Sequence, residues 1–323
     1  MAGPDSAGAQ ATEWKSVIPP RETPSAGTAR SLAPRHAGSP SFGTHTGAVT
    51  VTVLASRPTS PRAPAPSAPL RWRVLYTPPL DGAANMALDE ALLHRAAATG
   101  EGTLRVYAWS RPTLSLGRHQ SARGRYDLAR AAALGIAFVR RPTGGRAVLH
   151  HREVTYSIAA PAGPAGSLGT LAESYAWINR LLVEGLRALG ADVQVAAPAG
   201  RPPRPGIAPC FETPVEGELC AGGGKLVGSA QVRLHGALLQ HGSILVDDDQ
   251  PLAAELLREP GPPPPPAATL RSLLGVAPTQ RDVADALAGA LGPAEALQLD
   301  GALREHADAL RARYDDPAWT WRR

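Results

Sequence analysis

Lysine and cysteine are the two scarce residue types of this sequence. Lysine and arginine together number 33 in 323 residues, but only Lys15 and Lys225 are lysines, and Cys210 and Cys220 are the only cysteines. Two cysteines do not make a disulfide framework, and no C-x-x-C spacing supports a zinc site. In a chain that uses arginine for nearly every cation, Lys225 suggests a local need for a compact ammonium group.

Long apolar runs are also missing from the sequence. A signal peptide needs an apolar run of roughly 7 to 15 residues, and a membrane-spanning helix needs one of about 18. Because neither is present, we expect a soluble, cytoplasmic protein with no membrane partner.

The basic charge of the chain is confined to its first quarter. The formal net charge is +5, with eight Lys/Arg against three Asp/Glu in residues 1–80 and 25 of each in residues 81–323. A nucleic-acid-binding tail is one explanation. However, the tail has no interleaved aromatic residues apart from Trp14 and Phe42 and no recognisable reader motif, so we expect no nucleic-acid partner.

Composition divides the chain into four parts. Residues 1–69 are rich in Pro, Ala, Ser and Arg and lack apolar periodicity, which predicts a disordered tail. This tail has three possible origins: an organelle transit peptide, a lineage-specific extension or a misplaced start. Residues 70–259 form the predicted catalytic domain, 260–266 a polyproline linker, and 267–323 a helical segment packed on that domain.

Strands and helices alternate from residue 70 onward. The apolar periodicity predicts helices at 81–99, 168–189, 279–291 and 300–314, and strands at 71–76, 104–109, 113–116, 136–140, 225–234 and 238–246. We expect strands 147–150 and 154–159 to form one hairpin, and glycines 222–224 to turn another. The pattern favours the α+β class: a mixed β-sheet with flanking helices and a small C-terminal helical appendage.

Three stretches carry residues suited to chemistry. In Arg140-Arg141-Pro142-Thr143-Gly144-Gly145, two arginines end a strand and a Gly-Gly turn exposes backbone N–H groups, as a ligand-binding turn would. The same residues are also compatible with an ordinary glycine hairpin whose arginines are exposed to solvent. In Lys225-Leu226-Val227-Gly228-Ser229-Ala230-Gln231, small residues within a strand leave room for a ligand, or mark a bulge beside a surface lysine.

Cys210 is the third candidate. It lies on a loop rich in Gly and Pro, where a thiol is poorly placed to fill a core, whereas Cys220 on a strand suits a structural role. A thiol pKa of about 8.5 would fall beside an ammonium group and give a nucleophile at neutral pH.

Four ordered blocks resemble the biotin/lipoate protein ligase and lipoyltransferase superfamily. They are Asn85 to Glu90, Arg140 to Gly145, Lys225 to Gln231 and His241 to Leu245. Cys210-Phe211 upstream of the lysine block is most similar to the cysteine-type bacterial octanoyl-[acyl carrier protein]:protein N-octanoyltransferases. The resemblance covers about residues 70–323, including the terminal Arg313-Tyr314 and Trp319 to Arg323. It departs at His151, where an acidic residue is common, and in the Pro-rich 200–209 loop.

This resemblance implies the fold of the biotin/lipoate ligase catalytic domain and an octanoyl transfer reaction. The donor would be octanoyl-acyl carrier protein. The acceptor would be one lysine of a lipoyl-domain protein, such as the glycine cleavage H protein or a 2-oxoacid dehydrogenase E2 subunit. Cys210 would form an acyl-thioester, and Lys225 would lower the thiol pKa and hold the acyl carbonyl. No cofactor, ATP or metal is expected, because thioester exchange is nearly isoenergetic and amide formation is downhill.

The expected substrate-binding residues come from four strands and one turn. They are Arg140, Arg141, Thr143, Gly144, Gly145, His150, Gly228, Ser229, Ala230, Gln231, His241 and Gly242. The small residues among them are candidates for an oxyanion hole and for an acyl tunnel. Arg140 would face the acidic carrier protein or its phosphate, or form a salt bridge. His150 and His241 would shuttle protons, or be satisfied structural histidines.

Three other functions remain open. An ATP-dependent lipoate ligase would share the arginine, glycine and lysine positions but would need no cysteine. An amidotransferase that moves octanoate between lipoyl-bearing proteins would use a cysteine with a different donor. A catalytically dead acyl-binding protein is disfavoured by the presence of both Cys210 and Lys225.

Overall fold

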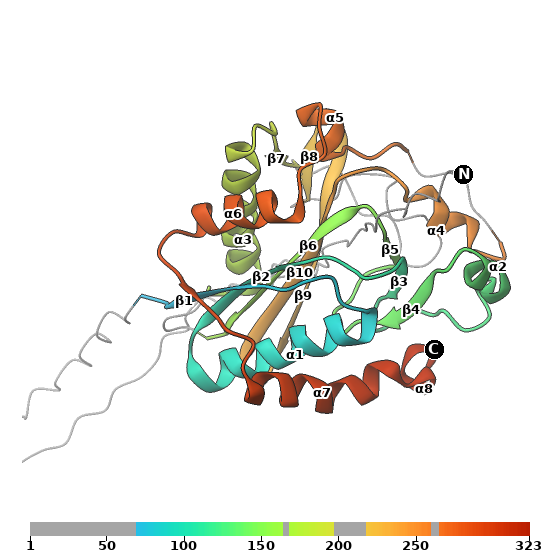
Figure 1. The fold of residues 1–323 in the computed structure, drawn as a ribbon, viewed down its shortest axis with the longest axis horizontal. Helices are drawn as coiled ribbons and strands as arrows, with labels where there is room; N and C mark the ends of the chain where they lie inside the picture. Colours follow the sequence, from blue (N-terminus) through green and yellow to red (C-terminus); the bar gives the residue numbers. More distant parts are fainter. Residues whose placement is uncertain (1–68, 164–167, 197–217, 260–264) are drawn as a thin grey trace, which may run out of the picture. The chain divides into compact units, whose positions relative to one another are not determined.

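Two β-sheets form the centre of the protein in a computed structural model, which describes residues 69–163, 168–196, 218–259 and 265–323 (Figure 1). The larger sheet has the strand order β11-β1-β2-β6-β10-β9-β8-β7, and the smaller has the order β4-β3-β5. The predicted tail, Cys210 and most of the polyproline linker lie outside the described residues.

The strands of the two sheets differ widely in length. They are β1 Trp72–Tyr76, β2 Gly102–Tyr107, β3 Thr113–Leu116, β4 Ala137–Arg140, β5 Val148–His150, β6 Glu153–Pro161, β7 Gln194–Val195, β8 Leu219–Ala221, β9 Gly224–Leu234, β10 Ala237–Leu245 and β11 Glu295–Ala296. In the larger sheet β1 pairs in parallel with β2 and β11, and the remaining pairs are antiparallel. The α+β class with a mixed sheet is therefore confirmed.

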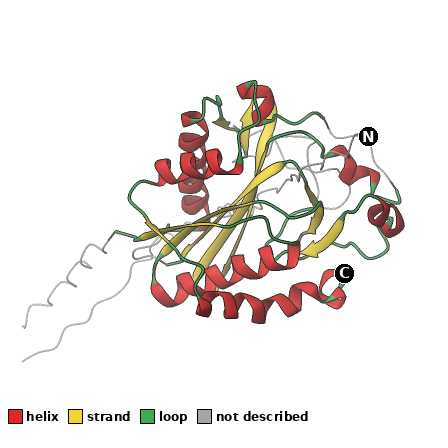
Figure 2. Cartoon of the chain, viewed as in Figure 1, coloured by secondary structure: helices red, strands yellow, loops and turns green. Residues whose placement is uncertain are grey.

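Helices cover both faces of the larger sheet (Figure 2). They are α1 Gly82–Thr99, α2 Leu128–Ala133, α3 Leu171–Ala188, α4 Pro251–Glu255, α5 Leu270–Leu274, α6 Gln280–Leu291, α7 Gly301–Asp315 and α8 Pro317–Thr320. Side chains of α3 and α6, including Ile178 and Leu287, pack with Tyr156 and Ile158 of β6 on one face. On the other face α1 packs with α7 and with Ala159 of β6. This alternation along β6 follows from the two-residue period of a strand.

Polar caps begin the long helices where the sequence pattern predicted them. The Asp81 carboxylate accepts the backbone N–H of Ala84 at 3.0 Å, and α1 ends at Gly100, whose φ of 69° lies in the left-handed region. Thr279 and Asp300 likewise cap α6 and α7. Each such cap contributes about 1 kcal/mol by satisfying a backbone donor.

The two predicted hairpins have opposite outcomes. Gly222 and Gly223 have positive φ and connect β8 to β9, so that hairpin is confirmed. The hairpin expected from 147–150 and 154–159 is wrong, because β5 pairs with β3 in the smaller sheet while β6 lies between β2 and β10 in the larger one. The short turn between β5 and β6 therefore carries the chain from the smaller sheet to the larger one.

No helix among the described residues is long and apolar enough to cross a membrane.

Candidate active site

Lys225 is buried at the start of β9 and is held by a carboxylate. Its side chain is 4 % exposed, and its Nζ lies 2.7 Å from Oε1 of Glu218, which is 1 % exposed. The β8–β9 hairpin brings the two together, because its register places Cys220 opposite Lys225 and leaves Glu218 just before β8. A desolvated ammonium–carboxylate pair of this kind is fixed in position, since separating the charges in a dry environment is costly.

Cys210 lies outside the described residues, but the ends of its segment do not. The chain leaves the described structure after Ala196 and returns at Glu218, and the Ala196 N–H donates to the Glu218 carbonyl at 2.7 Å. The segment that contains Cys210 therefore starts and ends beside the residue that holds Lys225. Cys220, the other cysteine, is buried in β8.

A second group of buried polar residues is centred on Asp89 of α1. The Asp89 carboxylate accepts Arg105 Nη1 at 2.7 Å, Ser157 Oγ at 2.8 Å and Tyr107 OH at 2.8 Å. Its Oδ2 also lies 2.8 Å from Nδ1 of His241. Burial opposes its ionisation, but the charge of Arg105 and these hydrogen bonds hold the pKa of Asp89 below its usual value.

His241 connects this group to the Arg-Arg-Gly-Gly block. Because the ionised carboxylate of Asp89 only accepts, Nδ1 of His241 carries a proton and donates it. Burial lowers the pKa of His241, so the ring is neutral at neutral pH and Nε2 accepts the Thr143 hydroxyl at 2.8 Å. Two residues singled out from the sequence, Thr143 and His241, thus meet in the interior.

His150 lies under an aromatic ring. Its imidazole stacks on Trp109 with ring centroids 3.6 Å apart, and its Nδ1 lies 3.7 Å from Glu153 Oε1. Burial, reinforced by the charge of Arg141, lowers the pKa of His150 well below its usual value. Both histidines are therefore neutral at neutral pH and fully buried.

Lys225 and His241 lie at different positions along the strands of the larger sheet. His241 pairs with Ala230, five residues along β9 from Lys225, which is about 16 Å at 3.3 Å per residue. Gly228 and Ser229 lie between these positions.

The two adjacent arginines hold backbone rather than carboxylates. Arg140 is fully buried and donates to the carbonyls of Thr320, Gly117 and Gln120 at 2.6–2.9 Å. Arg141 donates to the carbonyls of Ser115, Gly144 and Arg146 at 2.6–3.1 Å. The Arg141 guanidinium therefore shapes the Gly144-Gly145 turn, and Arg140 ties that turn's strand to residues near the C-terminus.

The small residues of β9 and β10 allow close strand packing. A side chain at Gly242 would place its Cβ 2.5 Å from the Gly228 carbonyl and 2.8 Å from Tyr156. Ser229 lies 2.6 Å from the Tyr156 hydroxyl, and Gln231 donates to Gln240 at 3.0 Å. Ala230 is buried opposite His241. At Gly242 the neighbouring strands therefore fill the volume that a side chain would need.

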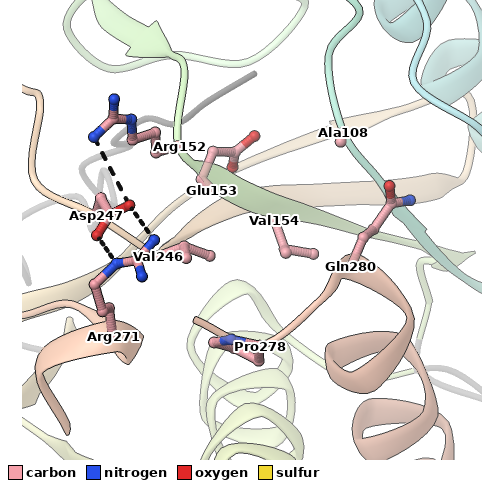
Figure 3. A pocket seen from close by; sticks show the side chains of 9 residues that line it. All are labelled: Ala108, Arg152, Glu153, Val154, Val246, Asp247, Arg271, Pro278 and Gln280. Atoms are coloured by element: carbon pink, nitrogen blue, oxygen red, sulfur yellow. Dashed lines mark hydrogen bonds and ion pairs between the residues drawn. The ribbon is translucent and has the colours of Figure 1, made fainter. Parts of the chain in front are cut away.

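A cavity of about 500 Å³ lies where β6 begins and β10 ends (Figure 3). Its lining residues are Ala108, Arg152, Glu153, Val154, Val246, Asp247, Arg271, Pro278 and Gln280, none of which the sequence analysis singled out. Arg271 pairs with Asp247 at its rim, as Figure 3 shows. A cavity walled by a carboxyl group and bordered by arginines is polar, unlike the tunnel that an alkyl chain requires.

Glu153 is the buried acid of this cavity. The hydroxyls of Thr155 and Ser243 donate to its two oxygens, and burial raises the pKa of Glu153 to about 8. The cavity adjoins the lysine end of the sheet. The pairing of β10 with β9 ends at Ile244 and Val227, two residues from Val246 of the cavity on one strand and two residues from Lys225 on the other.

Four buried polar residues of this region were not among the predicted site residues: Glu218, Asp89, Arg105 and Glu153. A signal existed for Glu218, because a hairpin through glycines 222–223 folds it back toward Lys225. Arg105 is the one charged residue of the fully buried strand β2. The described residues contain no group of three or more His, Cys, Asp or Glu side chains that could hold a metal ion.

The fold is that of a lipoate-ligase-type catalytic domain. A solved structure of lipoate-protein ligase A bound with ATP superposes with a TM-score of 0.63, at 22% identity over 79% of this chain and 99% of that one. A bi-partite lipoate protein ligase from Thermoplasma acidophilum, described with its E2 lipoyl domain, gives a TM-score of 0.61, at 21% identity over 78% and 96%.

Sequence comparison agrees with the structure. Residues 81–292 match the profile of the family described as the lipoyl protein ligase A/B catalytic domain, and the chain belongs to that family. The octanoyltransferase LipM of Kyrpidia tusciae is 42% identical over 274 residues, which are 78% of this chain and 99% of the relative. The superfamily expected from the four sequence blocks is thereby confirmed.

Proposed function

We propose that this chain is an octanoyltransferase of protein lipoylation, which moves an octanoyl group from octanoyl-acyl carrier protein to a lysine of a lipoyl domain. The observation that carries the proposal is the similarity over the full length of a named octanoyltransferase, combined with a buried Lys225 at the base of the Cys210 segment. The lipoyl-domain acceptor is supported by the family and by the E2 lipoyl domain described with a structural neighbour.

The reaction proceeds in two acyl transfers. The Cys210 thiolate attacks the thioester carbonyl, the bond from the acyl carbon to the phosphopantetheine sulfur breaks, and that thiol leaves with a proton. The neutral amine of the acceptor lysine then attacks the Cys210 thioester, an amide forms, and the Cys210 thiol is released. Both steps exchange one acyl bond for another, so the transfer needs neither ATP nor a metal.

Lys225 contributes a fixed positive charge to both steps. Opposite charge within a few ångströms favours the thiolate over the thiol and so lowers the thiol pKa. Glu218 holds the ammonium group in place at 2.7 Å, which keeps this charge at the base of the Cys210 segment. The ammonium is a point donor for the acyl oxygen, and this role does not depend on the planar geometry of arginine.

Intact-protein mass spectrometry after mixing with octanoyl-acyl carrier protein tests this function. We expect a mass increase of one octanoyl group that maps to Cys210 and is absent from Cys210→Ser. Cys220→Ser is the matched control and should keep the adduct. An adduct on Cys220, or transfer that requires ATP and survives in Cys210→Ser, would show that the proposed mechanism is wrong.

A further inference from the structure

Four arginines and a histidine gather where the last residues of the chain meet the smaller sheet. We name Arg118, His119, Arg140, Arg322 and Arg323 the arginine cluster. Arg140 and Arg322 contribute buried donor atoms, Nη2 and Nε respectively, that have no hydrogen-bond partner in the part of the chain that the structure describes. Buried donors of this kind are costly unless an acceptor reaches them.

The positive charges of the cluster repel one another. Burial and then the charges of Arg322 and Arg323 lower the pKa of Arg140 to about 10. Burial and then the charges of Arg118, Arg323, Arg322 and Arg140 lower the pKa of His119. No carboxylate among the described residues forms an ion pair with these five groups, unlike Arg105, which Asp89 neutralises at 2.7 Å.

The cluster adjoins the Gly144-Gly145 turn, and the side chains of Arg140 and Arg322 are held by neighbouring groups. The Arg118 N–H donates to the Thr143 carbonyl at 2.8 Å, which places Arg118 beside this turn. The Arg322 guanidinium lies over the Trp319 ring, 4.0 Å from its centroid, and Trp319 Nε1 donates to the Arg140 carbonyl at 2.8 Å. A preorganised set of cations loses little conformational entropy when an anion binds.

We propose that the arginine cluster docks the carrier-protein donor, binding its phosphopantetheine phosphate and the acidic surface around it. The inference rests on the proposed function, because it takes the donor to be a phosphopantetheine-bearing protein. A phosphodiester offers several acceptor oxygens and a permanent negative charge, which guanidinium groups bind well. A lipoyl domain presents carboxylates but no phosphate, so the unpartnered donors favour the acyl donor over the acceptor.

Charge reversal at the accessible members tests the docking surface. We expect Arg118→Glu/Arg323→Glu to lower kcat/KM for octanoyl-acyl carrier protein by about tenfold or more, mainly through KM, because long-range attraction becomes repulsion. With octanoyl-pantetheine, which lacks both protein and phosphate, the change should be about twofold at most. Arg180→Glu/Arg187→Glu is the matched control, since both arginines are exposed on α3. Rising ionic strength should reduce the wild-type rate and affect the Arg118→Glu/Arg323→Glu variant little.

Three outcomes would count against the proposal in different ways. Wild-type protein that accepts no octanoyl group from the carrier protein contradicts the proposed function itself. Active wild type with an unchanged KM in the Arg118→Glu/Arg323→Glu variant overturns the docking surface alone. A raised KM for the lipoyl domain without any change for the carrier protein assigns the cluster to the acceptor, and so also overturns it.

Discussion

The carboxylate of Asp89 and the imidazole of His241 meet at 2.8 Å in the interior of the protein, although 152 residues separate them in the sequence. Asp89 comes from helix α1 and His241 from strand β10, so their contact joins a helix to the middle of the larger sheet. Through Thr143 the same imidazole reaches the turn that follows β4. One neutral histidine thus contacts two other segments of the site through its two ring nitrogens.

Removing the Thr143 hydroxyl tests this connection. We expect Thr143→Val to lower the free energy of unfolding by about 1 kcal/mol, because the hydrogen bond to His241 Nε2 is lost in a buried place. Thr143→Ser keeps the hydroxyl and should cost less. Urea denaturation of both variants makes the comparison, and a loss in Thr143→Ser larger than that in Thr143→Val would mean that the methyl group matters more than the hydroxyl.

The buried acid Glu153 should give stability a pH dependence of defined sign. Its pKa is about 8 in the folded protein against about 4.5 unfolded, so between these values the folded state binds more protons. The contribution of Glu153 to the free energy of unfolding is therefore complete below pH 4.5 and is lost as pH rises through 8. In Glu153→Gln that loss should disappear, so the variant should lose less stability than wild type between pH 6 and 8.5. Denaturation curves at several pH values give the two slopes, and identical slopes would contradict the prediction.

Variants of the Lys225–Glu218 ion pair can separate the effect of Lys225 on stability from its effect on octanoyl transfer. Lys225→Met leaves a 1 % exposed carboxylate without its ammonium partner, which should cost about 3–5 kcal/mol of stability. The double variant Lys225→Met/Glu218→Gln removes both charges and should recover most of that loss, yet transfer should stay abolished. Thermal melts and octanoyl-transfer assays report the two properties. Recovery of transfer in the double variant would show that Lys225 acts only by neutralising Glu218.

A pair of glycines should respond to alanine in opposite directions. Gly242→Ala places a Cβ 2.5 Å from the Gly228 carbonyl, and such overpacking costs about 1–3 kcal/mol. Gly289 in α6 has nothing within 4 Å of its would-be Cβ, so Gly289→Ala should stabilise the protein by about 0.5–1 kcal/mol. Melting temperatures of both variants are the measurement. A neutral Gly242→Ala would mean that β9 and β10 can move apart there.

Much of the fold could be predicted from the sequence because the local signals for helices and turns agreed with the tertiary structure. Asp81, Thr279 and Asp300 begin helices as capping residues do, and glycines 222–223 turn the hairpin next to Lys225. The exception was the corner between His150 and Glu153. Strand patterns reveal which residues are buried, but they do not reveal which sheet buries them, so adjacent strands of two sheets look like a hairpin.

The site was less predictable because its partners are distant in sequence. Thr143 and His241 were singled out separately, and only the fold shows that they touch. Arg140 was expected to face the carrier protein or to form a salt bridge. No described carboxylate pairs with it, and its Nε and Nη1 atoms hold the backbone of three segments. Backbone carbonyls leave no trace in residue identity, so a clamp of this kind cannot be recognised from the sequence.

The attachment of Arg140 also bears on how the protein is made. One of its partners is the carbonyl of Thr320, 180 residues later, and the N–H groups of Ala122 and Arg123 donate to the carbonyl of Arg323. During synthesis the strand that carries Arg140 leaves the ribosome long before these partners exist. Contacts of such long sequence separation form late. The hydrogen bond from Arg140 to the Thr320 carbonyl can therefore form only after Thr320 has left the ribosome, so the anchoring of this strand is a late step of folding.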